Sequence, residues 1–144
     1  MFRCVPPLCC RVRGVVEKQK GRLKNLSSPD GLPAHIQRVC VEPVQAEVAT
    51  APPGAFYLVL TNSHDLDLAT TQAVLARGDF GSFGLIGSRT KRARFDHRLR
   101  HRGFAPTSIE RMTCPIGVPG IAGKEPEVIA VSVVAQLLQA SSGG

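Results

Sequence analysis

Residues 56–92, FYLVLTNSHDLDLATTQAVLARGDFGSFGLIGSRTKR, decide the fold. Residues 56–61 form a continuous apolar run, which is typical of a strand buried on both faces of a parallel sheet. Apolar residues at helical spacing follow, with Ser63 placed to cap the start of a helix and Gly78 placed to end it. Residues 82–86 then predict a second strand. Strands that alternate with helices predict an α/β fold with a parallel sheet and flanking helices.

The rest of the chain extends this pattern. Residues 36–41 predict a short strand and residues 106–111 a turn or short helix. Residues 128–138 predict a helix that is apolar on almost every side, and we therefore expect it to be deeply packed. Three strands are few for such a sheet, so the chain either dimerises or forms part of a larger fold. Residues 1–30 show neither strand nor helix periodicity and are expected to be an irregular basic tail, and residues 141–144 a flexible end.

Positive charge is concentrated in two segments. The 144-residue chain carries a formal net charge of +7, and residues 1–24 and 89–102 each hold seven basic residues and one acidic residue. Residues 89–102 predict a surface helix, opened by Ser88 and ended by Gly103, whose basic side faces water. Such clusters favour anionic partners. A nucleic acid is not expected, because the chain contains no recognised nucleic-acid-binding module and few aromatic residues.

The cysteines and the apolar runs indicate a cytoplasmic protein. Five cysteines at irregular spacing include no CxxC pair, so we expect neither a disulfide framework nor a metal site of that kind. The N-terminus is interrupted by Pro6 and Pro7 and is not expected to be a signal peptide. No apolar run reaches the roughly 20 residues of a membrane-spanning helix. No spacing indicates a Ser/His/Asp arrangement, so no catalytic residues are expected.

The segment GLIGSRTKR (84–92) is a strand–loop–helix junction. Unpaired amide groups and the positive end of the helix dipole make such a junction a candidate anion site. The alternative is a simple helix cap with solvated cations. The candidate residues at this junction are Gly87, Ser88, Arg89, Lys91 and Arg92.

The segment TNSHDLD (61–67) follows the first buried strand. His64 and Asp67 lie three apart, so a helix places them on one face, where they could support a metal ion or a proton transfer. The alternative is a capped, solvated helix start with acidic residues near the dipole.

The segment TCPIGVPGIAGKEPE (113–127) carries glycines at three-residue intervals, Gly117, Gly120 and Gly123, followed by Lys124 and Glu125. It fails as a nucleotide-binding P-loop because Val118 and Glu125 replace the required residues. A glycine-rich turn can still bind phosphate through backbone amides. Cys114 is either a reactive thiol near cations or a small buried apolar side chain.

Three blocks, FYLVLTNSHDLDL, RGDFGSFGLIGSRTKRARF and TCPIGVPGIAGKEPEVIAVSVVAQLL, resemble the C-terminal half of the xanthine dehydrogenase accessory protein family, XdhC/CoxI, over residues 33–139. The resemblance implies a truncated, partial Rossmann-like domain over residues 31–140. It also implies a maturation factor that is not itself an enzyme. Such a factor binds the molybdenum cofactor (molybdopterin), promotes its sulfuration with a cysteine desulfurase, and delivers it to xanthine dehydrogenase or a related molybdenum hydroxylase.

The resemblance also implies site residues. Three loops are expected to converge at the carboxyl edge of the sheet, with Ser88, Arg89 and Lys91 at the cofactor phosphate and Cys114 near the metal-dithiolene end. The full set of implied cofactor-binding residues is Gly87, Ser88, Arg89, Lys91, Arg92, Cys114, Gly117, Gly120, Gly123 and Lys124, with Thr61, His64, Asp67 and Glu125 shaping the pocket. Asn62 stands where relatives are expected to carry histidine, which argues against a metal there.

The family's N-terminal domain and its first Rossmann strand with a glycine-rich turn are expected to be missing, which leaves both retention and loss of cofactor binding open. Two alternatives therefore stay open. One is a nucleotide- or NAD(P)-dependent oxidoreductase on a Rossmann scaffold, against which the absence of a GxGxxG motif counts. The other is a non-functional fragment.

Overall fold

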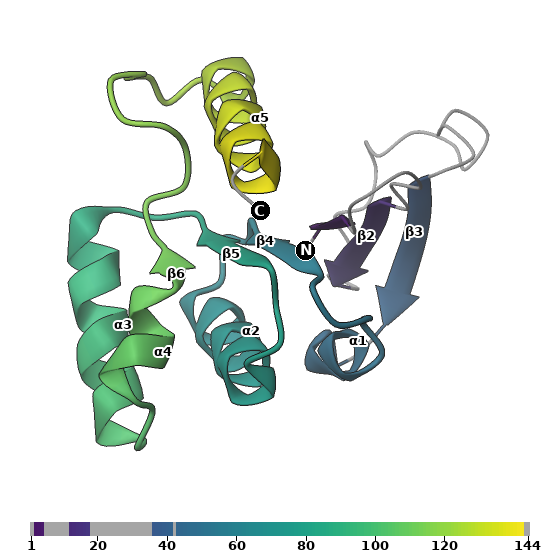
Figure 1. Ribbon diagram of the computed structural model, residues 1–144, viewed down its shortest axis with the longest axis vertical. Helices are drawn as coiled ribbons and strands as arrows, with labels where there is room; N and C mark the ends of the chain where they lie inside the picture. Colours follow the sequence, from purple (N-terminus) through teal and green to yellow (C-terminus); the bar gives the residue numbers. More distant parts are fainter. Residues whose placement is uncertain (1, 5–11, 18–35, 42, 143–144) are drawn as a thin grey trace. The chain divides into compact units, whose positions relative to one another are not determined.

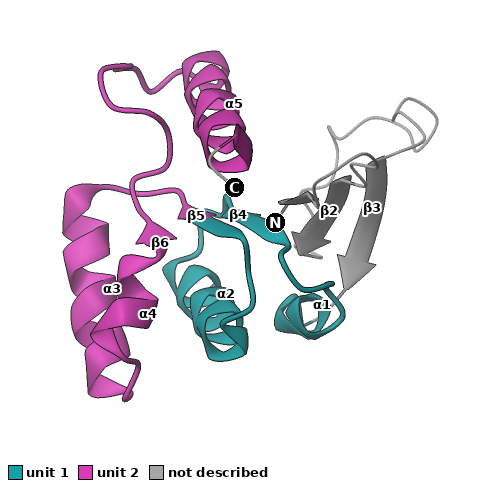
Figure 2. Ribbon diagram, in the orientation of Figure 1, with its two compact units in different colours: residues 1–83 teal, residues 84–144 magenta. Residues whose placement is uncertain are grey.

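A computed structural model describes residues 2–4, 12–17, 36–41 and 43–142, the first three segments as backbone only. Strands and helices alternate along the chain (Figure 1). The chain divides into two compact units, residues 1–83 and residues 84–144, which Figure 2 distinguishes by colour. Each unit is described by itself below.

The first unit contains a mixed sheet. Its strands are β1 (Phe2–Cys4), β2 (Val12–Glu17), β3 (Ile36–Val41) and β4 (Phe56–Val59), followed by the start of β5 (Ser82–Leu85). They are hydrogen-bonded in the order β3-β2-β1-β4-β5. Strand β1 is antiparallel to both β2 and β4, with Phe2 opposite Leu58, whereas β2 and β3 run parallel.

The strands β1 and β2 correct one expectation. Residues 1–30 were expected to be irregular, but residues 2–4 and 12–17 form strands, and the remainder of that stretch lies outside the described residues. Short strands are stabilised by pairing with segments distant in sequence, which local periodicity does not report. The strand predicted at residues 36–41 is confirmed as β3.

The helix predicted after β4 is confirmed. Helix α2 (His64–Arg77) begins at Ser63, whose hydroxyl accepts a hydrogen bond from the amide of Leu66. It ends at Gly78, which has a φ of 70°. The preceding strand is buried along most of its length, including Phe56, Tyr57 and Val59. A short helix, α1 (Gln45–Ala49), lies in the segment before β4.

The second unit contains the end of β5 and four further elements. These are α3 (Arg89–His101), α4 (Pro106–Glu110), β6 (Met112–Thr113) and α5 (Pro126–Ser142). Within this unit β6 is the hydrogen-bonded neighbour of β5. Gly103, with a φ of 83°, follows the end of α3 as predicted. The two-residue strand β6 was not predicted.

The alternation of β4, α2, β5, the α3–α4 pair and β6 gives a Rossmann-like α/β fold, as the sequence predicted. A helix that connects two neighbouring strands returns the chain to the same end of the sheet, so the two strands run parallel. A three-stranded parallel sheet with flanking helices results, and the antiparallel strand β1 is an addition to the predicted pattern.

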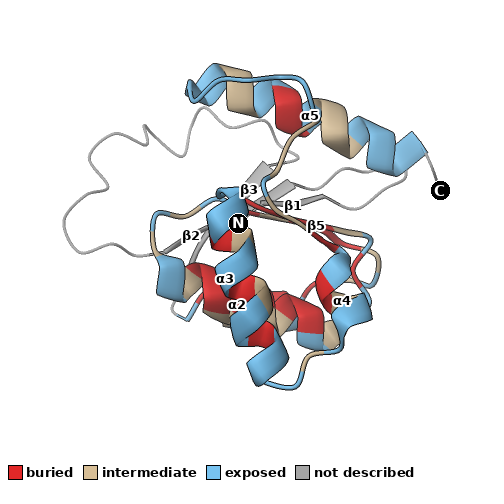
Figure 3. Cartoon of the chain, turned by 90° about the vertical axis from the view of Figure 1, so that its left-hand side faces the viewer, coloured by how far each residue is buried: buried red, intermediate tan, exposed pale blue. Residues whose placement is uncertain are grey.

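Helix α5 is less buried than expected. Of its 17 residues, Ser132 and Val133 are buried, and Figure 3 shows most of the helix exposed or half-buried. Val131, Val134 and Leu138 are 63%, 54% and 62% exposed. The expectation of deep packing was wrong. The apolar composition of α5 indicates that the helix can pack against another surface, but it does not show that the described residues of this chain form that surface.

None of the helices within the described residues combines the length and the apolar composition that a membrane span requires.

Candidate functional site

The junction between β5 and α3 is built around Gly87. The Ser88 hydroxyl caps α3 by accepting a hydrogen bond from the amide of Lys91 at 3.1 Å. A Cβ atom on Gly87 would lie 2.6 Å from Cδ of Lys91 and 3.2 Å from Sγ of Cys114. Glycine is therefore required for this packing, and the junction brings Gly87, Lys91 and Cys114 together as expected.

Lys91 places a positive charge inside the unit. The residue is only 8% exposed. Its Nζ donates to the carbonyl oxygen of Ile86 at 2.7 Å and lies 5.5 Å from the ring centroid of Phe95. A buried ammonium needs such partners because its desolvation is unfavourable. The charge is thus held at the end of β5, on the same side of Gly87 as the Cys114 thiol.

Arg92 has a structural role instead of the expected anion-binding role. Its Nη1 donates to the carbonyl oxygen of Met112, and its Nη2 donates to that of Ile109 at 3.0 Å. Its Nε donates to Oδ1 of Asp96 at 2.7 Å. The guanidinium therefore ties α3 to α4 and β6. The sequence could not show this, because the carbonyl partners lie 17 and 20 residues further along the chain.

The first turn of α3 retains groups that suit an anion. Ser88 and Arg89 are exposed. The amide of Lys91 is taken by the cap, and the amide of Arg92 bonds to the Ser88 carbonyl oxygen at 2.9 Å. The amides of Arg89 and Thr90 precede the first hydrogen bonds within the helix and form part of the positive end of the helix dipole. These two amides and the Arg89 side chain are the donors available at this end.

The connection from β6 to α5 is fixed onto α5 by side chains of that helix. The amide of Gly117 donates to Oε1 of Gln136 at 2.9 Å, and the amide of Val118 donates to Oγ of Ser132 at 2.9 Å. A Cβ atom on Gly117, which has a φ of 102°, would lie 2.3 Å from Oγ of Ser132. The expectation that the Gly117 amide is available to a phosphate is therefore corrected.

The second half of this connection forms a separate turn. The amide of Lys124 donates to Oε2 of Glu125 at 2.9 Å, and a Cβ atom on Gly123 would meet Glu125 and Val128. Gly120, with a φ of 92°, has open space around it. Figure 1 shows the connection rising from β6 and arching before it joins α5. Lys124 thus lies next to α5, and none of its described hydrogen bonds reaches Ser88.

The expected pocket residues of the 61–67 segment lie in the first unit. The Thr61 hydroxyl donates to Oδ1 of Asp67 at 2.6 Å, and Asp67 is fully buried. His64 is exposed at the first position of α2. The shared helical face predicted for His64 and Asp67 is therefore divided between solvent and interior. Among the described residues, no group of three potential ligands could hold a metal ion.

A family model described as the XdhC Rossmann domain matches residues 15–137. The chain belongs to the XdhC Rossmann domain family. The match begins upstream of residue 33, where the sequence blocks first suggested the resemblance, and extends across the β5–α3 junction and the β6–α5 connection.

The chain spans only part of the length of the known proteins that it resembles. The chain is 34% identical over 87 residues to the uncharacterized protein YqeB of Escherichia coli (strain K12), covering 60% of this chain and 15% of that protein. A crystal structure of a xanthine dehydrogenase from Bacillus halodurans superimposes with a TM-score of 0.58 at 23% identity. That superposition covers 76% of this chain and 30% of the solved one, and it shows the fold.

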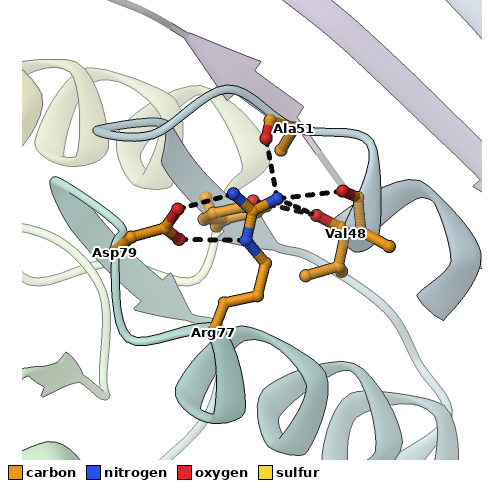
Figure 4. Close-up of polar contacts among 6 residues, drawn as sticks. Val48, Ala51, Arg77 and Asp79 are labelled. Atoms are coloured by element: carbon orange, nitrogen blue, oxygen red, sulfur yellow. Dashed lines mark hydrogen bonds and ion pairs between the residues drawn. The ribbon is translucent and has the colours of Figure 1, made fainter.

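One polar cluster of the XdhC-type domain was missed by sequence reasoning. Arg77 forms a bidentate pair with Asp79, with N–O distances of 2.9 and 2.6 Å (Figure 4). Its Nη1 also donates to the carbonyl oxygens of Val48 at 2.6 Å and Ala51 at 2.7 Å. The available signal was the order Arg77-Gly78-Asp79 at a helix end, because a left-handed glycine turns the chain back beside the last helical turn.

The Arg77–Asp79 pair also shifts the titration of both groups. The hydrogen bond from Arg77 lowers the pKa of Asp79 below its usual value, and the same bond raises the pKa of Arg77. These groups hold the last turn of α1 and Ala51 against the end of α2, so we assign them a structural role.

Proposed function

We propose that the chain is an accessory protein, not an enzyme, which serves a xanthine dehydrogenase or a related molybdenum hydroxylase. Its membership of the XdhC family supports this role. The chain spans 15% of YqeB and 30% of the solved relative, so the activities of those longer proteins are not transferred whole.

We further propose that the β5–α3 junction binds the phosphate end of the molybdenum cofactor. The observation that carries this proposal is the convergence of Gly87, Lys91 and Cys114. The Arg89 and Thr90 amides and the Arg89 guanidinium are suited to bind the phosphate, since a helix N-terminus favours an anion. The buried Lys91 ammonium adds positive charge beside them.

The residues present fit such a group at both ends. A pterin phosphate is an anion, which suits the exposed Arg89 side chain and the first amides of α3. The half-buried Cys114 thiol lies beside Gly87 and suits the sulfur-rich end of the cofactor. The cofactor, when bound, supplies the metal and dithiolene chemistry of the hydroxylase. The chain's contribution is to hold and orient it while a cysteine desulfurase provides sulfur and the hydroxylase receives the product.

Pterin recovery tests the proposal. The chain is purified from cells that make the molybdenum cofactor, oxidised, and assayed for pterin fluorescence per mole of protein. Arg89→Ala removes one charge-assisted contact, so we expect recovery to fall roughly tenfold, the equivalent of about 1.4 kcal/mol. Cys114→Ala is expected to lower recovery as well.

Thr107→Ala is the matched control, because Thr107 is exposed and lies on α4, outside the junction residues 84–92. Its pterin recovery is expected to equal that of the unmodified chain. Absence of pterin from both the unmodified chain and a longer XdhC relative would refute cofactor binding. Equal recovery from Arg89→Ala and Thr107→Ala would refute the junction as the site.

A further inference from the structure

The outer surface of α3 carries exposed basic side chains that the proposed cofactor site does not use. They lie from the middle of the helix to its end, and all of them are exposed. Figure 3 shows much of α3 exposed. We call this surface the arginine face; its members are Arg94, His97, Arg98 and His101, which lie at i, i+3, i+4 and i+7 and share one side of the helix. The buried residues Lys91, Phe95 and Leu99 lie on another side of α3, and the members of the arginine face are all exposed.

The arginine face has no internal counter-charge. Arg92 takes Asp96, the one acidic residue of the helix. Within residues 43–142, no ion pair joins an arginine of the face to a carboxylate. Arg94 and Arg98 lie four residues apart, and like charges at this spacing repel on a helix. An acidic partner would relieve this repulsion.

The composition of the face indicates the kind of partner. It contains no large apolar side chain that could insert into a membrane surface. The helix's one large aromatic side chain, Phe95, is buried, so α3 offers no such ring on which an unpaired base could stack. Its fixed charges are all arginines, which pair with carboxylates through two parallel hydrogen bonds and are enriched at protein interfaces.

We infer that the arginine face is the docking surface for an acidic patch on a partner protein, the molybdenum hydroxylase of the proposed function. This inference rests on that function and adds the contact surface. The face and the cofactor junction lie on the same helix, so docking brings the N-terminal end of α3 to the partner without using the junction's own donors.

Binding to the purified apo-hydroxylase tests the inference. Arg94→Gln with Arg98→Gln removes two positive charges from the face. Thr107→Glu with Gln139→Glu changes the net charge of the chain by the same amount at exposed positions elsewhere. We expect the double glutamine variant to bind about tenfold more weakly at low salt, with the difference shrinking as salt screens the charges. The double glutamate variant is expected to bind within about twofold of the unmodified chain, because its changes lie outside the contact.

Pterin recovery from the same variants separates this inference from the proposed function. Loss of hydroxylase binding with normal pterin recovery supports the arginine face. Equal hydroxylase binding by both double variants overturns it and leaves cofactor binding intact. Tighter binding of a 20-base-pair DNA duplex or of phosphatidylserine vesicles than of the hydroxylase, abolished by Arg94→Gln with Arg98→Gln, also overturns it. If the unmodified chain neither binds the hydroxylase nor yields pterin, the proposed function itself fails.

Discussion

Replacing Arg92 by Ala is expected to destabilise the chain instead of weakening an anion site. The substitution removes the donors to the carbonyl oxygens of Ile109 and Met112, both of which are residues only 1% exposed. It also removes the pair with Asp96. The three contacts tie α3 to α4 and β6, so their loss loosens the packing on which the β5–α3 junction depends.

The size of the effect follows from the two carbonyl contacts. Loss of a charged donor to a buried acceptor costs about 1–3 kcal/mol, and we count little for the half-exposed pair with Asp96. The sum is about 2–6 kcal/mol of unfolding free energy. In a domain of this size that lowers Tm by roughly 5–20 °C.

Thermal unfolding followed by circular dichroism measures this change, with Arg94→Ala as the control. Arg94 lies two residues after Arg92 on the same helix, is exposed, and makes no ion pair within the described residues. Its replacement by Ala should therefore change the free energy of unfolding by less than about 0.5 kcal/mol. Arg92→Lys keeps the charge but loses the planar guanidinium that donates to several acceptors, so its Tm should lie between those of Arg92→Ala and Arg94→Ala. The reasoning is refuted if Arg92→Ala and Arg94→Ala melt at the same temperature.

Three further outcomes are expected. Arg77→Ala removes the donors to Val48 and Ala51 and should lower the unfolding free energy by about 1–3 kcal/mol in urea titration, whereas an unchanged midpoint would show that the clamp contributes nothing. Because Arg77 lowers the pKa of Asp79 in the folded state, the stabilisation from this pair is present above the unfolded pKa of about 4 and is lost as pH falls through the lower folded pKa. Asp79→Asn should therefore flatten the acid limb of the stability curve, and an unaltered limb would contradict the assignment. Gly117→Ala forces a non-glycine residue to a φ of 102° against Ser132 and should cost about 1–3 kcal/mol, measurable as a lower Tm than that of a Ser108→Ala control.

Elements with local signals were predictable from the sequence. Ser63 and Gly78 bound α2, and Ser88 opens α3, because a capping hydroxyl and a left-handed glycine act within one turn of their own position. The alternation of strand and helix then predicted the α/β fold. The juxtaposition of Gly87 and Cys114 was expected from the convergence of their loops, although β6, the strand that precedes Cys114, was not predicted.

Features that depend on distant partners were not predictable. The amide of Gly117 is taken by Gln136, 19 residues away, and no local pattern indicates that pairing. Arg92 looked like a solvated cation because its carbonyl partners are backbone atoms, which carry no sequence signature. The apolar composition of α5 indicated burial, but composition alone does not say which surface provides it.

The attachment of the glycine-rich connection to α5 has a practical consequence for chimeras. The side chains of Ser132 and Gln136 accept hydrogen bonds from the amides of Val118 and Gly117, so the loop and the final helix have to be exchanged together in a chimera. A graft of residues 114–125 into a related domain would need a serine and a glutamine at the positions of Ser132 and Gln136, one helical turn apart. A shift of the helix by a single residue would break both hydrogen bonds to the loop, even with every glycine retained.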